Sequence, residues 1–496
     1  MKIGTLTIVL AASFVAAPLG AQEVPERLSL EQAIEIARAA NPGFRQTRND
    51  EHVSDWNVRQ AYGRLFPQAN ASASLGWQGT GEQQLGTLTL GDLGFGNQPS
   101  YYNSSYSLRL SYSLDWATIL GPSQAKADRV TTRAQIGMAE ANLVSQVTAQ
   151  YLETLRQQEA VRIAEVQLEN SRFNLRLAEA QLEIGTVTGI DVGQAEVQVG
   201  RSDVQVLQAR NGLETGRIRL LQQLGQRVGG EFELSTIFEL TAPTWEVAEL
   251  RDMALTRNPT LAARRSARAS ADIGVNSARS SYLPTLSLAT GWTGFTRQAS
   301  TTDFQIAQAQ AQVAGSIAQC VSTNGLYSRL VPPLPPLDCS RFAFTDAQRQ
   351  AIISQNDQFP FGFVGSPPTV SLSLSVPIFV GLSRQRNLEA ARVQRDDAVE
   401  QIREQELALE ADIAIGLANA RTAYQSALLE ERNRELADRQ LLLARERYQL
   451  GEVTFVDLVA AQTVLAQAEV DQVRAVFAYH DVVTNLEALV GVPLRN

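Results

Sequence analysis

The strongest constraint on this chain is an internal duplication that its own residues reveal. Within residues 181–198 a helical pattern stops at a glycine, passes through a short turn and restarts at a threonine, and residues 447–464 repeat the arrangement. Identical residues 266 positions apart are Gly185/Gly451, Val187/Val453, Thr188/Thr454, Asp191/Asp457, Ala195/Ala461 and, further on, Gly225/Gly491. Glycine after a helix, and threonine three residues before an acid, are helix stop and start signals. Each copy therefore predicts a tight helical hairpin.

A second offset, of 217 residues, connects the segments upstream of the two hairpins. Asn41-Pro42 recurs as Asn258-Pro259, and Pro67 recurs as Pro284. The two offsets differ by 49 residues, and a longer outer loop in the second copy explains nearly all of this difference. The 496-residue chain is therefore predicted to be two copies of one structural unit.

The predicted organisation has five parts. They are a signal peptide over 1–21, a first repeat over 22–225 with its hairpin tip at 185–188, a linker over 226–244, a second repeat over 245–491 with its tip at 451–454, and a C-terminal tail over 492–496. The signal peptide follows from Lys2, the apolar run after it and the small residues before Gln22. A buried N-terminal helix is the alternative interpretation of that segment.

After Pro67 and Pro284 the period of the apolar residues changes from about 3.6 to 2, which predicts strands. Four strands are expected, at 67–77, 105–117, 284–293 and 369–380, with an outer loop over 294–368. One face of each strand is apolar with aromatic residues near its ends. The other face is rich in serine, with Arg109 and Asp115 on that face of the second strand. Such strands are typical of a transmembrane β-barrel.

A soluble sandwich shows the same alternation, but it needs a second layer over its apolar face and does not normally sit between very long helices. In lipid, four strands cannot close a barrel, and open sheet edges are not tolerated. The lipid interpretation therefore requires several chains to share one barrel. Arg109 and Asp115 are then candidates for the lumen of that barrel.

Two long stretches without proline keep the helical period, from Ser123 to Ile184 and from about Leu382 to Leu450. At 1.5 Å per residue, helices of this size span roughly 90 to 105 Å. Each is expected to return through its hairpin as a shorter helix, over about 189–224 and 454–490. A periplasmic coiled-coil scaffold without a pore would look similar. The strand patterns in the same repeats argue against that alternative.

The composition excludes several functions. With two histidines, two cysteines and three methionines, the chain offers no cluster with metal-ligand spacing and no nucleophile–base arrangement. We therefore expect neither an enzyme nor a cofactor. Removing the signal peptide takes away Lys2 and no acid, so the formal net charge moves from −9 to −10, which disfavours nucleic-acid binding. Beyond the signal peptide no run of 18 apolar residues predicts a membrane-spanning helix.

Cys320 and Cys339 both fall in the outer loop of a chain that is expected to be exported. We predict that they form a disulfide, because exported proteins fold in oxidising compartments. Closing a loop of about 20 residues would stabilise the fold by roughly 3 kcal/mol in the chain-entropy model. Two free thiols are the alternative.

The signal peptide, the duplicated order of helices, strands and hairpin, and the tip sequence from Tyr448 to Asp457 together resemble the TolC-like family of outer-membrane efflux channels. The resemblance covers essentially the whole mature chain. It implies a mixed α and transmembrane β fold and a homotrimer. Four strands from each chain would form one twelve-stranded outer-membrane barrel, continued by a long α-helical barrel through the periplasm.

The resemblance also implies partners and a location. The expected partners are a periplasmic adaptor (membrane fusion) protein, an inner-membrane transporter and outer-membrane lipid. The expected location is the outer membrane of a Gram-negative-type cell, with a large periplasmic portion. The implied function is a passive export duct of a tripartite efflux or type I secretion system. Because the transporter selects the cargo, the sequence does not separate these two.

In such channels the hairpin tips form the periplasmic entrance. Asp457 matches an acidic position of the family, and Asp191 is its copy, so both are gate candidates. Ala460 and Val453 stand where well-known members carry a second acid and a basic gate residue, which weakens the expectation of a charged latch. By resemblance, the adaptor-docking candidates are Gly185, Thr188, Gly451 and Thr454. The alternative is that the acids only favour the first turn of each helix and the glycines only serve the turns.

Overall fold

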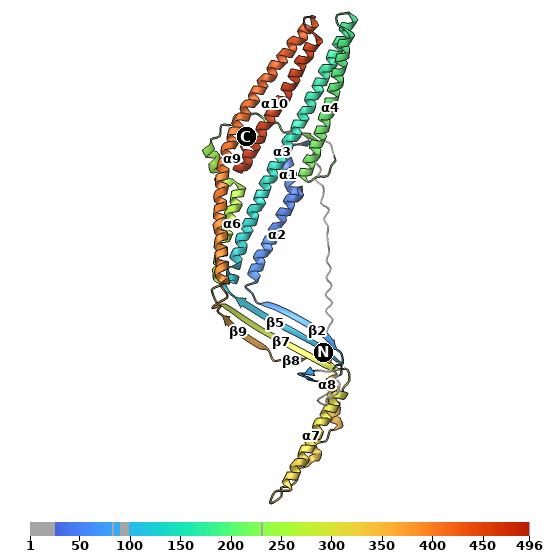
Figure 1. Cartoon of the computed structure of the whole chain (residues 1–496), viewed down its shortest axis with the longest axis vertical. Coiled ribbons are helices and arrows are strands. Elements are labelled where there is room, and N and C mark those ends of the chain that lie inside the picture. Colours follow the sequence, from blue (N-terminus) through green and yellow to red (C-terminus); the bar gives the residue numbers. More distant parts are fainter. Residues whose placement is uncertain (1–24, 82–83, 90–98, 230–231, 496) are drawn as a thin grey trace. The chain divides into compact units, whose positions relative to one another are not determined.

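The computed structural model describes residues 25–81, 84–89, 99–229 and 232–495 (Figure 1). The predicted signal peptide over 1–21 lies outside the described residues. The described residues divide into a helical unit, drawn from 25–59, 123–276 and 388–495, and a strand unit, drawn from 60–122 and 277–387. In the described part of the chain, no helix combines the length and the apolar character needed to cross a membrane.

Long helices dominate the helical unit, where α3 pairs with α4 and α9 with α10 in two hairpins (Figure 1). The helices that contribute to this unit are α1 (Leu30–Ala40), α2 (Pro42–Gly63), α3 (Trp116–Glu183), α4 (Gly189–Leu224), α5 (Val247–Arg257), α6 (Pro259–Ser280), α9 (Ser383–Gln449) and α10 (Phe455–Val490). The predicted linker over 226–244 contains a short strand, β6 (Glu233–Leu234), which pairs in parallel with β1 (Arg27–Leu28). The linker is therefore part of the folded unit.

The strand unit contains one antiparallel sheet. Its long strands are β2 (Gln68–Gln78), β5 (Tyr101–Leu114), β7 (Thr285–Ala299) and β9 (Thr369–Ser375), paired in the order β2, β5, β7, β9. The short β8 (Val364–Gly365) also pairs with β7. Two strands of two residues each, β3 (Gln84–Leu85) and β4 (Leu88–Thr89), pair with each other and are not part of this sheet.

Three of the predicted strand boundaries need correction. β5 starts four residues before 105 and β7 runs six residues past 293, so the beginning of the predicted outer loop is strand. β9 ends at Ser375, five residues before 380, because Pro377 has no backbone N–H to donate to the ladder.

The predicted strand over 105–117 is wrong at its end, where Asp115 starts a helix. The Asp115 Oδ1 atom accepts a hydrogen bond from the Thr118 N–H at 2.6 Å, and α3 begins at Trp116 rather than at Ser123. This capping bond starts α3 before Pro122, and the helix continues through Pro122. Asp115 therefore does not stand on a strand face.

Successive residues along a strand point to opposite sides of the sheet, and residues paired across strands point to the same side. The sheet therefore has one apolar and one polar face. Leu108 lies opposite Ala71 and Trp292, whereas Arg109 lies opposite Asn70 and Gly291. On the polar face, serine hydroxyls meet across the strands, with 2.9 Å between the Oγ atoms of Ser72 and Ser107. Most of the apolar face is exposed in the described part of the chain. Side chains exposed by 67% to 73% on this face are Leu75, Val370, Leu372 and Leu374.

Helices fill most of the predicted outer loop over 294–368. They are α7 (Asp303–Tyr327), the 3-10 helix η1 (Cys339–Phe342) and α8 (Asp346–Asn356). The Sγ atoms of Cys320 and Cys339 are joined, so a disulfide connects α7 to η1. The outer loop is therefore a folded helical extension.

In each repeat, the C-terminal end of the returning hairpin helix contacts the junction between two upstream helices. These are α1 and α2 in the first repeat, and α5 and α6 in the second. The Asn41 side chain donates to the Gln223 carbonyl and accepts from the Phe44 N–H. Asn258 repeats the arrangement, donating to Leu489 O at 2.8 Å and accepting from the Leu261 N–H at 2.8 Å. One amide thus satisfies the end of one helix and the start of another. We call this contact the asparagine clamp.

Glycine is required where each clamp closes. Gly225 and Gly491 have φ of +73° and +80°, in the left-handed region that ends many helices. A Cβ atom on Gly491 would lie 2.5 Å from the Arg257 carbonyl oxygen, and one on Gly225 would collide with Ala40 O. Both the backbone angle and the close backbone approach therefore exclude a side chain.

We expect Gly491→Ala to destabilise the helical unit by about 1–3 kcal/mol, because alanine is strained at positive φ and its Cβ meets backbone. Thermal unfolding followed by circular dichroism in detergent measures the change. Gly200→Ala is the matched control. Gly200 lies inside α4 with nothing within 4 Å of an added Cβ, so alanine should stabilise by about 0.5–1 kcal/mol. Equal effects of the two substitutions would contradict this account of the clamp.

Candidate functional site

The first candidate site is the pair of hairpin tips. Both turns close in the same way, with Gly185 and Gly451 at φ of +76° and +74°. Backbone hydrogen bonds from Thr186 to Gln181 and from Glu452 to Arg447 complete the turns at 3.0 and 2.9 Å. The tip glycines are exposed.

The threonine and the aspartate that follow each turn form the start of the returning helix. In the second copy, the Thr454 N–H and hydroxyl both donate to Asp457 Oδ2, at 2.9 and 2.7 Å, and the Asp457 N–H donates to Thr454 Oγ1 at 3.3 Å. In the first copy, the Thr188 N–H and hydroxyl donate to Asp191 Oδ2 at 2.9 and 2.8 Å. Both carboxylates are therefore engaged in capping their own helices.

These hydrogen bonds lower the pKa of both carboxyl groups. For Asp457 the larger cause is the bond from the Thr454 hydroxyl, and for Asp191 it is the bond from the Thr188 backbone. Both side chains are consequently charged at neutral pH. Among the described residues neither carboxylate has a basic partner within ion-pair distance. The tips thus present free negative charge.

The two tips of one chain pack against each other through an apolar cluster. It contains Ala178, Ala195, Ala437, Leu441, Tyr448, Phe455, Leu458, Ala461 and Leu465, which come from α3, α4, α9 and α10. Val187 and Val453 pack against its margin. Val453 therefore contributes packing at the position where the family resemblance suggested a basic gate residue.

Tyr448 is a tip residue whose importance the sequence did not show. Its side chain is 3% exposed and its ring meets Phe455 edge-on, with 5.9 Å between the centroids. The buried hydroxyl has no hydrogen-bond partner among the described residues. Burial, and then the charge of Asp191, raise the pKa of the Tyr448 hydroxyl. The structure thus brings Asp191 near a residue of the other hairpin.

The signal that could have identified Tyr448 is a difference between the copies. The equivalent position in the first copy is Leu182, so a hydroxyl-bearing ring replaces an aliphatic side chain at one tip only. In the same way, Phe455 of the second copy stands at the position of Gly189 in the first copy. Both aromatic residues are buried in the tip cluster.

A buried chain of polar side chains lies behind the tips. Ser202 of α4 meets Ser171 of α3 with 2.9 Å between the hydroxyl oxygens. Gln462 of α10 donates to Ser171 at 3.3 Å and accepts from Asn174 of α3 at 2.7 Å. All four side chains are at most 6% exposed. Because an unpartnered buried polar group is costly, this chain favours one alignment of the two hairpins.

The remaining predicted site residues lie in the strand unit. Arg109 is exposed on the polar face of β5, as expected from the alternation. Asp115 caps α3 instead of occupying that face. Among the described residues there is no group of histidine, cysteine and acidic side chains that could hold a metal ion.

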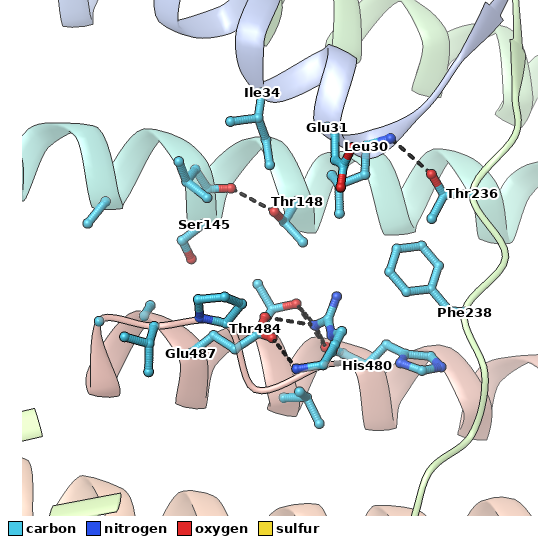
Figure 2. A pocket seen from close by; sticks show the side chains of 18 of the residues that line it. Leu30, Glu31, Ile34, Ser145, Thr148, Thr236, Phe238, His480, Thr484 and Glu487 are labelled. Atoms are coloured by element: carbon cyan, nitrogen blue, oxygen red, sulfur yellow. Dashed lines mark hydrogen bonds and ion pairs between the residues drawn. The ribbon is translucent and has the colours of Figure 1, made fainter. Parts of the chain in front are cut away.

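A second candidate site is a cavity of about 1020 Å³ in the helical unit (Figure 2). Figure 2 shows Leu30, Glu31 and Ile34 of α1 on one side, Ser145 and Thr148 of α3 beside them, and Thr484 and Glu487 of α10 opposite. Phe238 from the linker between the repeats closes one end. The wall is a mixture of apolar groups and hydroxyls, with no nucleophile–base pair.

The C-terminal tail forms part of this cavity. Glu487 Oε1 accepts hydrogen bonds from the N–H groups of Leu494 and Arg495, at 2.8 and 3.1 Å. The Arg495 guanidinium donates to His480 O at 2.7 Å and also to the Thr484 hydroxyl. The predicted tail over 492–496 is therefore anchored to α10 in its described part.

His480 is a buried titratable group in the wall of this cavity. It is 2% exposed, and neither ring nitrogen has a hydrogen-bond partner among the described residues. Burial, and then the nearby Arg495 charge, lower the pKa of His480 from 6.5 to about 4. The ring is therefore neutral at neutral pH, between Phe238 and Tyr479.

Since the folded pKa lies below the usual value, the folded state binds fewer protons than the unfolded state as pH falls below 6.5. Stability should therefore be full above that pH and decrease toward pH 4. We expect a loss of about 2 kcal/mol between pH 7 and pH 5. Chemical unfolding at the two pH values measures it.

His480→Phe, which keeps the ring packing, should remove this part of the pH dependence. His52→Gln, a histidine replacement at an exposed position, is the matched control. If His480→Phe and the parent protein lose stability equally on acidification, the assignment to His480 is wrong.

Comparison with known proteins places these features in a family. The model of the family described as outer membrane efflux protein matches residues 33–226 and 345–492, which together exceed half of the chain. The pyoverdine export outer membrane protein OpmQ of Pseudomonas putida is 25% identical over 281 residues. That alignment covers 52% of this chain and 55% of the relative, so the match spans about half the length of each protein.

Solved structures share the fold over nearly the whole chain. CusC, described as forming a transmembrane channel, superposes with a TM-score of 0.66 at 17% identity, covering 93% of this chain and 92% of that one. The Campylobacter jejuni CmeC outer membrane channel gives 0.66 at 14% identity, covering 93% and 85%. The resemblance inferred from the sequence is thus confirmed. The chain belongs to the outer membrane efflux protein family, a family of TolC-like channels of the outer membrane with a large periplasmic portion.

Proposed function

We propose that this chain is the outer-membrane duct of a tripartite export system and works as a homotrimer. The observation that carries the proposal is the unclosed sheet. Among the described residues, β2 pairs only with β5 and β9 pairs only with β7, so each of these edge strands has one side without a partner strand. In lipid such edges must be paired. Three chains would pair β9 of one with β2 of the next and close a twelve-stranded barrel.

The faces of the sheet support this arrangement. The exposed leucines and valines of one face suit contact with lipid hydrocarbon, and the serine-rich face suits a wet lumen. Arg109 is proposed to line that lumen. The long helical hairpins would continue the duct through the periplasm, and they would meet a periplasmic adaptor and an inner-membrane transporter. The duct itself would be passive.

The cargo is proposed to be a small molecule. The relative OpmQ is described as a pyoverdine export protein, and its similarity favours small-molecule efflux over protein secretion. At the periplasmic entrance, Asp457 and Asp191 would place negative charge at the tips. The exposed residues Gly185, Thr188, Gly451 and Thr454 are proposed as the surface on which the adaptor docks.

The first test is the native mass of the protein extracted from isolated outer membranes in mild detergent. We expect three copies of a 54.1 kDa chain, less the signal peptide. The alternative function, a periplasmic scaffold without a pore, predicts that the protein is recovered in the soluble periplasm. A membrane-bound monomer would contradict the shared barrel.

A charge-specific test separates the gate role of Asp457 from its capping role. Asp457→Asn removes the charge and keeps an oxygen that can accept from Thr454, whereas Asp457→Ala removes both. If the acid acts at the entrance, both variants should reduce cation selectivity in planar-bilayer conductance measurements. The Asn variant should do so with little change in thermal stability.

Asp191→Asn is the matched control at the other tip. It tests whether both carboxylates contribute or only the more exposed Asp457. Unchanged selectivity in both Asn variants, with lower thermal stability in Asp457→Ala alone, would mean that Asp457 is only a helix cap.

A further inference from the structure

The segment from Gln358 to Val364 returns from the helical extension to the sheet and lies against β5 and β7. Its sequence, Gln-Phe-Pro-Phe-Gly-Phe-Val, places three phenylalanines at alternate positions. No charged residue occurs from Gln358 to Ser383. We call it the 358–364 segment.

This segment packs on the apolar face of the sheet. The rings of Phe359 and Tyr102 lie 5.5 Å apart, and those of Phe363 and Tyr106 lie 4.9 Å apart in an edge-on arrangement. Tyr102 and Tyr106 lie an even number of residues from Leu108 on β5, so all three side chains point to the same side of the sheet, opposite to the serine-rich face. Phe359 and Phe363 therefore continue the face formed by the strand leucines.

The apolar face carries polar side chains at this end, and two of them bind the segment. Ser104 Oγ donates to Pro360 O at 2.5 Å, and Gln298 Oε1 accepts from the Phe359 N–H at 2.9 Å. Ser104 and Thr296, which lie opposite each other on β5 and β7, are each 3% exposed. Ser104 and Gln298 of the strands thus bind the backbone of the segment.

The segment is held firmly at both ends. On one side, the Asn356 side chain exchanges two hydrogen bonds with the backbone of Ala299, both 2.8 Å long. On the other side, Val364 and Gly365 pair with Phe295 and Gly294 as β8. Gly294 makes room for the Tyr106 ring, because a Cβ there would lie 2.3 Å from that ring. The position of the segment on the face is therefore fixed by both strand and side-chain bonds.

Phe361, between the two packed phenylalanines, is 81% exposed. Phe361 thus presents apolar surface, and burying that surface against an apolar partner would be favourable. Aromatic side chains at the edge of a lipid-facing surface favour the boundary between hydrocarbon and headgroups.

We infer that the 358–364 segment is a membrane-contacting element, which extends the lipid-facing surface of the strands and inserts Phe361 among the lipids at the outer boundary of the bilayer. The inference rests on the proposed function, because it takes the apolar face of the sheet to be the lipid face. The occupant is lipid rather than a partner protein, since the surface continues an uncharged strand face and offers no charged group for recognition.

Site-directed spin labelling tests the inference. Cys320 and Cys339 are paired, so a cysteine introduced by Phe361→Cys is the thiol that a nitroxide reagent modifies. The labelled protein is reconstituted into phosphatidylethanolamine and phosphatidylglycerol vesicles, and the label's accessibility to oxygen and to a water-soluble nickel chelate is measured. We expect a several-fold excess of oxygen over nickel accessibility at position 361.

Labels at two control positions show what lipid contact and water exposure look like in the same protein. Leu372→Cys, on the apolar face of β9, reports lipid contact of the sheet, and Ala311→Cys, exposed on α7, reports water. A nickel-accessible label at 361 beside a lipid-exposed label at 372 would overturn the inference alone. Low accessibility to both reagents at 361 would also overturn it, because a neighbouring copy would then cover Phe361. A water-exposed label at 372 would overturn the proposed function as well.

Discussion

The structure depends on how the backbone groups at the ends of its helices are satisfied. A helix leaves its last carbonyls and first N–H groups without internal partners. In each repeat one asparagine, Asn41 or Asn258, supplies both, and a left-handed glycine lets the two chain segments approach. This clamp fixes the end of each returning helix to the short helices upstream. The very long helices, whose own contacts are spread thinly over many turns, thereby acquire a fixed base.

Periodicity predicted the strands and hairpins well, because each depends on local alternation or on local stop and start signals. It failed at Asp115 because Trp116 continues the alternation of β5, while the side-chain bond from Asp115 to the backbone begins a helix. Tyr448 was also missed, since its burial depends on the other hairpin. The cavity and the anchored tail bring Leu30, Thr236 and Thr484 together across hundreds of residues. Contacts of that kind leave no local pattern.

The two hairpins combine two kinds of contact. Near the tips the contact is mainly apolar, with one hydrogen bond from the Gln181 side chain to the Tyr448 carbonyl. Behind the tips, the chain from Ser202 to Asn174 has directional hydrogen bonds between buried groups. Movement of one hairpin against the other would have to break these bonds or pivot about them. The polar chain therefore restricts the alignment of the two hairpins more strongly than the apolar contact does.

The duplication also changes the symmetry of the contact between the tips. Two identical partners related by a two-fold axis must each present the same residue at equivalent positions. Here the halves are joined in one chain and have diverged, so Tyr448 and Phe455 of the second copy replace Leu182 and Gly189 of the first. One half contributes large rings and the other contributes alanines such as Ala178 and Ala195. The joined halves thus gain an asymmetric interface, with large rings on one side and small residues on the other, that two identical subunits related by a two-fold axis could not have formed.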